Sequence, residues 1–353
     1  MIILFSIVLV LCILSIKKRD GNERDYMSVK MSNSIKGFFL CMVFFSHICG
    51  YTDFSHPLLD NPYHIIRRVT GQCIVTMFLF YSGYGIMESI KKRGQNYVKA
   101  FPIQRFLRVL LLFDCAILLF LIYRYLTGVH YPVKKLILTF LGWDGIGNSN
   151  WYIFCVLWVY IFTYVAFSVY KDKNSKAVLN IFILSVLYMA VMYKLGKEHW
   201  WYDTILCYSY GMFFSLYRQK IENFIDESTG AWLLSLIIFS IGYIVTYFYR
   251  NTNPLIYQIN VFLFVAAITT FTMHFVIDNR ILQWLGSNLF ELYILQRLPM
   301  MILKPYILTE EATPSIKYIY VVSCFAITII ISTIYSKTIS EGIKKITSNL
   351  QHL

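Results

Sequence analysis

Residues 35–47 read IKGFFLCMVFFSH, an apolar stretch that carries Lys36 at its start and His47 at its end. An α-helix rises about 1.5 Å per residue, so a lysine at the membrane edge would place His47 roughly 16 Å deeper, near the middle of a hydrocarbon core about 30 Å thick. Ionisable groups at that depth are costly and are usually functional. The stretch therefore predicts a membrane helix with a candidate functional histidine.

The composition of the whole chain is that of a membrane protein. Of 353 residues, 58% are hydrophobic and only 14% are charged, whereas about a quarter are charged in soluble domains. The fold class we expect is all-α, a polytopic membrane helical bundle of about 11 transmembrane helices. The predicted spans are 2–16, 35–50, 69–90, 106–126, 151–169, 177–193, 200–217, 231–249, 256–277, 288–304 and 315–336. The apolar stretch 136–142 is too short to cross and is expected to be re-entrant or interfacial.

The distribution of basic residues predicts the orientation. Alternating spans place 21 of the 32 Lys and Arg residues on one side, which the positive-inside rule makes cytoplasmic. The N-terminus is then outside and the C-terminus cytoplasmic, in the cell membrane. The net charge of +13 is explained by this basic face and does not require a nucleic-acid partner. We expect an extra helix and cytoplasmic loop at 1–33, one membrane domain at 34–336 and a cytoplasmic tail at 337–353.

Several polar residues inside or beside the spans are candidates for chemistry, and each also has a structural interpretation. His47 suits proton transfer but could also be a buried histidine bonded to a neighbouring helix. Arg105 and Arg108 lie three apart on one helix face and suit phosphate binding, or they set topology beside anionic lipid. Asp114 is a candidate for proton handling or helix pairing. Ser82, in the interrupted span FLFYSGYG at 78–85, belongs to a site of close helix or ligand approach.

Some function classes lack their usual signals. The chain has no HExxH, GxSxG, Walker loop or CxxC. The eight cysteines are scattered singly in apolar runs, so we expect neither disulfides nor a metal site. Glu291 and Arg297 lie six apart on one predicted helix, so each needs a partner elsewhere.

Taken in order, these segments resemble the acyltransferase 3 family, integral membrane enzymes that move acyl groups, usually acetyl, onto extracytoplasmic glycans. The spacing of Lys36 and His47 is similar to the family's first motif, with lysine in place of arginine. FLFYSG at 78–83 resembles its FFxxSG motif, and Arg105 and Arg108 keep its Arg-x-x-Arg motif. Softer likenesses are NWYIFCVLWVY at 150–160, WYDTILCYSYGMFFSLYRQKI at 201–221 and LQWLGSNLFELYILQRLPM at 282–300. The family often has histidine where this chain has Gln296, so only His47 is carried over as catalytic.

The resemblance implies an O-acyltransferase, expected to be an O-acetyltransferase, with acetyl-CoA as donor substrate and no bound cofactor. Its partners would be acetyl-CoA, a surface glycan or lipid-linked oligosaccharide, and the lipid bilayer. His47 would be general base or acyl carrier, and Lys36, Arg105 and Arg108 would bind the donor. Candidate supporting residues are Ser82, Asp114, Glu291 and Gln296. Because aromatic faces suit sugar rings, the candidate acceptor cleft is lined by Trp151, Tyr152, Trp200 and Trp201.

The competing class is a membrane component without acyl transfer, a polysaccharide flippase, exporter or polymerase whose ionisable residues line a path. It would lose glycan export, and not acylation as such, when His47 is changed.

Overall fold

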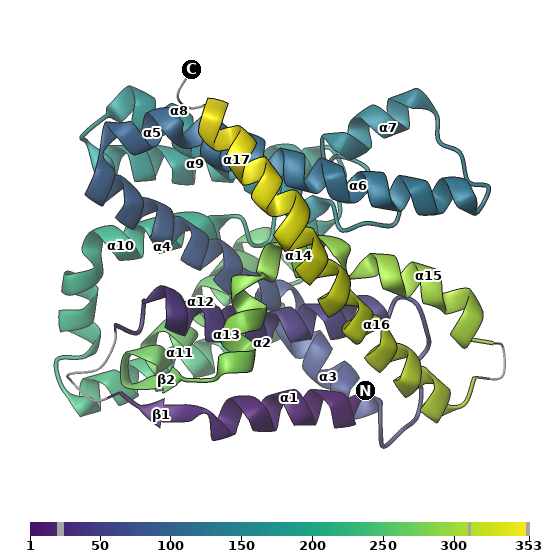
Figure 1. Cartoon of the computed structure of the whole chain (residues 1–353). Coiled ribbons are helices and arrows are strands. Elements are labelled where there is room, and N and C mark those ends of the chain that lie inside the picture. The colour runs from purple at the N-terminus through teal and green to yellow at the C-terminus, as the bar shows by residue number, and fades with distance from the viewer. Residues whose placement is uncertain (20–24, 310–311, 351–353) are drawn as a thin grey trace.

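The computed structural model describes residues 1–19, 25–309 and 312–350, and it is a bundle of helices with one short two-stranded ribbon (Figure 1). Residues 20–24 of the predicted helix-and-loop segment 1–33, residues 310 and 311 of the predicted membrane domain and residues 351–353 of the predicted tail lie outside these ranges. The elements of the first half are α1 (Ile2–Leu14), β1 (Ile16–Lys18), α2 (Val29–Ile48), α3 (Asn61–Thr70), η1 (Gly71–Val75), α4 (Thr76–Arg93), α5 (Gln95–Phe101), η2 (Pro102–Leu107), α6 (Arg108–Leu126), α7 (Val133–Phe140) and α8 (Trp151–Tyr170). Those of the second half are α9 (Asn174–Lys194), η3 (His199–Trp201), α10 (Leu206–Ile225), α11 (Thr229–Tyr249), α12 (Pro254–His274), β2 (Phe275–Ile277), α13 (Arg280–Ser287), α14 (Leu289–Leu295), α15 (Arg297–Ile307), α16 (Pro314–Tyr335), η4 (Ser336–Ser340) and α17 (Glu341–Leu350).

The predicted all-α membrane bundle is confirmed, but the count of about 11 spans is not. Within the described residues, seven helical stretches are long and apolar enough to cross a membrane. They are Asn61–Arg93, Gln95–Leu126, Trp151–Tyr170, Asn174–Lys194, Thr229–Tyr249, Pro254–His274 and Pro314–Leu350.

The other four predicted spans are not among these seven stretches. The helix α1 has 13 residues, which at 1.5 Å per residue reach about 20 Å, short of the 30 Å core. The predicted span 288–304 is broken into α14 and α15 at Gln296. Helices α2 and α10 have 20 residues each, and most of the residues of α2 are buried. An inner helix that packs on protein can keep polar side chains that a lipid-facing helix cannot.

Glycines allow α4 and α10 to pack with their backbones in contact. A Cβ atom on Gly83 would lie 2.0 Å from the carbonyl oxygen of Tyr208, and one on Gly211 would lie 2.0 Å from that of Phe80. Such small-residue crossings let helices approach closely in membranes. The glycine of the FLFYSG segment therefore serves a helix contact, one of the two interpretations that the sequence left open.

A second glycine pair joins α2, the helix of His47, to α13. A Cβ on Gly37 would lie 2.0 Å from the carbonyl oxygen of Leu282, and one on Gly286 would lie 1.9 Å from that of Asn33. The contact fixes the position of α2 against the C-terminal part of the chain. It thereby sets where the end of α2 lies.

Different elements lie at the two ends of the bundle. At one end lie α7 and α15, toward the right in Figure 1, whereas α5 and the ribbon of β1 and β2 lie at the other. The ribbon is antiparallel and pairs Lys17 with Val276. Beside it the Lys30 ammonium, 2.9 Å from Asp278, lowers the pKa of that carboxyl to about 2. The helix α7 has eight residues, consistent with a stretch too short to cross.

Candidate functional site

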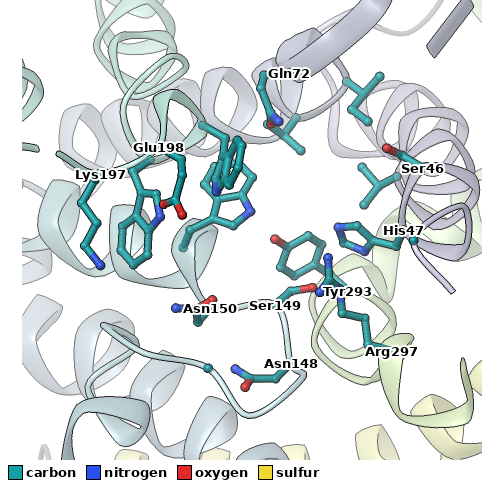
Figure 2. Close-up of a pocket in the computed structure, with 18 of the residues that line it drawn as sticks. Ser46, His47, Gln72, Asn148, Ser149, Asn150, Lys197, Glu198, Tyr293 and Arg297 are labelled. Carbon is teal, nitrogen blue, oxygen red and sulfur yellow. The ribbon is translucent and has the colours of Figure 1, made fainter. Parts of the chain in front are cut away.

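A cavity of about 570 Å³ lies against the last turn of α2 (Figure 2). Its wall comes from parts of the chain that are far apart in sequence: α2, α3 and η1, the loop before α8, the segment around η3, and the α14–α15 break. The lining residues are Val43, Ser46, His47, Gly50, Arg67, Gly71, Gln72, Ile74, Val75, Trp143, Asp144, Gly145, Asn148, Ser149, Asn150, Trp151, Lys197, Glu198, Trp200, Trp201, Tyr293 and Arg297.

His47 faces this cavity from the last turn of α2. Its Nδ1 atom is buried and has no hydrogen-bond partner among the described residues. The centroid of its ring lies 6.1 Å from that of Tyr293, which comes from α14. An imidazole nitrogen without a protein partner can accept a proton from a substrate hydroxyl or attack an acyl group.

Two guanidinium groups lie beside His47. Arg67, from α3, donates from Nε to Ser46 Oγ at 3.1 Å. Arg297, the first residue of α15, lies beside the rings of His47 and Tyr293 (Figure 2), and its buried Nε has no partner in the described part of the chain. No ion pair joins either arginine to a described carboxylate.

Indole rings form much of the wall farther from His47. Trp151 begins α8, and Trp143 comes from the loop before α8. Trp200 and Trp201 belong to η3. The Trp143 and Trp201 centroids are 5.7 Å apart, and the Lys197 ammonium lies 3.9 Å and 4.2 Å from them. Broad aromatic faces beside polar groups can hold a sugar ring while hydrogen bonds orient it.

Tyr152 does not share this wall with its sequence neighbour. It is buried, its ring packs 5.1 Å from Tyr293 and 6.3 Å from Phe78, and it is not a lining residue. Successive helical residues point about 100° apart, so Trp151 and Tyr152 face different surroundings. Tyr152 supports Tyr293 from behind.

The loop that precedes α8 is held in place by backbone contacts. Arg124 Nε donates to the Ile146 carbonyl at 2.9 Å, and Asn150 Nδ2 donates to that of Gly142 at 3.1 Å. Gly147 has a φ of +114°, a conformation that side-chain-bearing residues rarely adopt. These contacts present Ser149 to the cavity next to Tyr293 (Figure 2).

Lys36 lies about two turns inside the opposite end of α2, which begins at Val29, and lines a separate cavity of about 740 Å³. The two cavities share no lining residue. Carboxylates in the second cavity are already paired, since Asp25 bonds Arg218 at 2.5 Å and Glu88 bonds Lys91 at 2.6 Å. Lys36 therefore adds positive charge there, together with Lys92 and Arg93 of α4.

Arg105 and Arg108 line a third cavity, of about 250 Å³, with Arg93 and Lys344. Arg105 lies in η2, a π-helical turn, a feature that often marks functional sites. Its Nε donates to Tyr97 Oη at 2.9 Å. Arg93 lines both this cavity and that of Lys36. The three residues predicted to bind the acyl donor, Lys36, Arg105 and Arg108, therefore lie on one basic surface.

The candidate supporting residues lie elsewhere. Ser82, Asp114, Glu291 and Gln296 line none of these cavities. Glu291 accepts a hydrogen bond from Ser340 Oγ at 2.9 Å and lies near Arg108. Gln296 is buried, donates to the Tyr293 carbonyl at 3.1 Å and does not line the cavity of His47. No group of three or more His, Cys, Asp or Glu among the described residues could hold a metal ion.

Sequence reasoning missed the roles of Arg67, Tyr293 and Asn148–Asn150 in this wall. A partial signal existed for Arg297, an intramembrane cation with no partner on its own predicted helix. The others come from loops or from an ordinary apolar run, and only the fold brings them to His47.

Comparison with known protein families gives a match over most of the chain. The family described as an acyltransferase domain matches residues 32–337, nearly the whole chain. No curated protein and no solved structure matches the chain.

Proposed function

Because the chain belongs to the acyltransferase 3 family, we propose that this membrane acyltransferase moves an acetyl group from cytoplasmic acetyl-CoA to a hydroxyl of an extracytoplasmic polysaccharide. The observation that carries the proposal is the placement of His47. It faces a polar, indole-lined cavity at one end of α2, while a basic surface lies around the other end.

The basic surface suits the donor. The phosphates of acetyl-CoA are anionic, and arginine binds phosphate oxygens through paired N–H groups. Arg105 and Arg108 would take these phosphates, with Lys36 closer to the helix that leads to His47. The 11 positions from Lys36 to His47 correspond to about 16 Å of helix, which the flexible arm of the donor would have to cross along α2 and α4.

His47 could transfer the acetyl group by either of two routes, and both account for every bond and proton. In the first, a ring nitrogen takes the proton of the acceptor hydroxyl as the oxygen attacks the thioester carbonyl, and the CoA thiolate leaves and is then protonated. In the second, the nitrogen itself attacks and the thiolate leaves. The acetyl group then passes from the imidazole to the hydroxyl, whose proton goes to the freed imidazole nitrogen and on to the thiolate. The same residue serves either route.

The test is transfer of labelled acetyl from acetyl-CoA to surface glycan in membranes that carry wild type or His47→Ala. We expect the variant to lose at least about a hundredfold in rate, since a positioned acid–base group typically contributes 10²–10⁴-fold. Protein level and glycan export are measured in parallel.

His130→Ala is the matched control, because His130 is an exposed loop histidine outside the described cavities. If His47→Ala and wild type transferred equal amounts of label, His47 would not be a catalytic residue. Absence of transfer by wild type, together with an export defect in His47→Ala, would favour a polysaccharide transporter.

A further inference from the structure

We infer that the end of the cavity beside His47 binds an anionic group, a carboxylate or a phosphate, which the acceptor glycan carries close to the hydroxyl that it offers to His47. The identity of the ligand as acceptor rests on the proposed function. The binding of an anion can be tested without it.

Arg67 and Arg297 bring positive charge to the end of the cavity beside His47. Both face the cavity next to His47, and neither has a described carboxylate partner. Both residues are half-buried, and an acceptor that covered their guanidinium groups without supplying a counter-charge would do so at a cost in free energy. The planar fork of arginine matches carboxylate and phosphate oxygens, which would supply the missing acceptors.

The carboxylates of the cavity do not neutralise these arginines. Asp144 accepts a hydrogen bond from the Gly145 amide at 2.7 Å and lies 3.9 Å from the Lys135 ammonium. Glu198 lies with Lys197 on the indole side, across the cavity from His47 and Arg297 (Figure 2). Two arginines therefore lie at the end of the cavity beside His47, whereas Asp144 is engaged with Lys135 and Glu198 lies on the opposite side.

This arrangement divides the acceptor into two parts. The indole wall would take the sugar ring, and the two arginines would take the acid group, which orients one hydroxyl toward His47. A neutral glycan would leave both guanidinium charges unpaired, and a site built around a polar group rejects the analogue that lacks it. The arginine pair would therefore determine acceptor specificity.

Binding is tested first, on purified full-length protein, by thermal unfolding with sodium glucuronate, inorganic phosphate or glucose. At least one anion is expected to raise the Tm of wild type, and glucose is not. The Arg67→Gln/Arg297→Gln double variant should lose the shift. Arg68→Gln, which changes an exposed arginine of the same helix that does not line the cavity, should keep it. The inference is overturned if neither anion shifts the Tm of wild type, or if the double variant responds equally.

Transfer is tested next with surface glycan whose esters have been removed. The glycan is offered intact, after chemical reduction of its carboxyl groups, or after removal of its phosphates. Wild type should lose about tenfold to a hundredfold in kcat/KM on one of the treated glycans, the size expected when a charge-assisted hydrogen bond is lost. The treatment that causes the loss identifies the anion. The arginine variants should lose activity on the intact glycan and little more on the treated one.

Two results would contradict the inference in this second assay. Wild type could use all three glycans equally, or the arginine variants could lose the same factor on every glycan, which would mean that the arginines act on the acyl group. Anion-dependent stabilisation without acetyl transfer to any glycan would support the anion site and contradict the acetyltransferase itself.

Discussion

His199 and Asp203 form a pair whose response to pH can be predicted. The imidazole Nδ1 lies 2.5 Å from Asp203 Oδ2, in the turn before α10, and this hydrogen bond raises the pKa of His199 above its ordinary 6.5. A group whose pKa is raised by folding contributes stability that is complete below its unfolded pKa and is lost as pH rises through the folded value. Asp203→Asn should therefore lower the Tm more at about pH 5.5 than at about pH 8.5. An equal decrease at both pH values, or a pH-dependent difference that persists in a His199→Gln background, would contradict this interpretation.

The individual site residues differ in how far the sequence could place them. His47 could be identified because an ionisable group in an apolar run needs a reason. Trp151 lines the cavity and its neighbour Tyr152 does not, because successive positions of α8 point about 100° apart. Arg67 reaches Ser46 only through the packing of α3 on the end of α2, and no local pattern reports such a contact.

The crossing of α4 and α10 gives a stability prediction with a control on the same helix. Gly83→Ala would put a methyl group 2.0 Å from a backbone oxygen, so the helices must separate. We expect a loss of about 1–3 kcal/mol in unfolding free energy, as for other overpacked sites. Gly85→Ala has nothing within 4 Å and should be neutral or stabilising by up to about 1 kcal/mol, because alanine favours a helix. Chemical or thermal unfolding in detergent measures both, and equal stability of the two variants would rule out the close crossing as a determinant of stability.

The sequence could show that Gly83 and Gly85 interrupt a span, but it could not tell them apart. Gly83 needs Gly211 opposite it, 128 positions later in the chain, whereas Gly85 faces an open cavity. The break at Gln296 has one local sign in the sequence, Pro299, which has no N–H to donate to the Leu295 carbonyl where α14 ends. Apolarity identifies helices that contact lipid, and it says less about helices enclosed by protein.

The residues that share each end of the bundle make the predicted orientation testable. Trp151 begins α8 at the cavity of His47, and 20 residues of helix extend about 30 Å to the other end. There Gln95 donates to the Phe167 carbonyl at 3.4 Å, beside the basic surface. Asp172 follows α8 at that end, whereas Leu58 lies between α2 and α3 at the end of the His47 cavity, and both are exposed. Leu58 is predicted to lie outside.

Cysteine labelling tests this orientation. In intact cells a membrane-impermeant maleimide should label Leu58→Cys and leave Asp172→Cys unlabelled until the membrane is opened. The native chain is a suitable background, because six of its eight cysteines are buried and the other two are only partly exposed. If only Asp172→Cys were labelled in intact cells, the bundle would have the opposite orientation in the membrane. The basic surface would then face away from cytoplasmic acetyl-CoA and the His47 cavity away from surface glycan, so this result would contradict the donor and acceptor sides together.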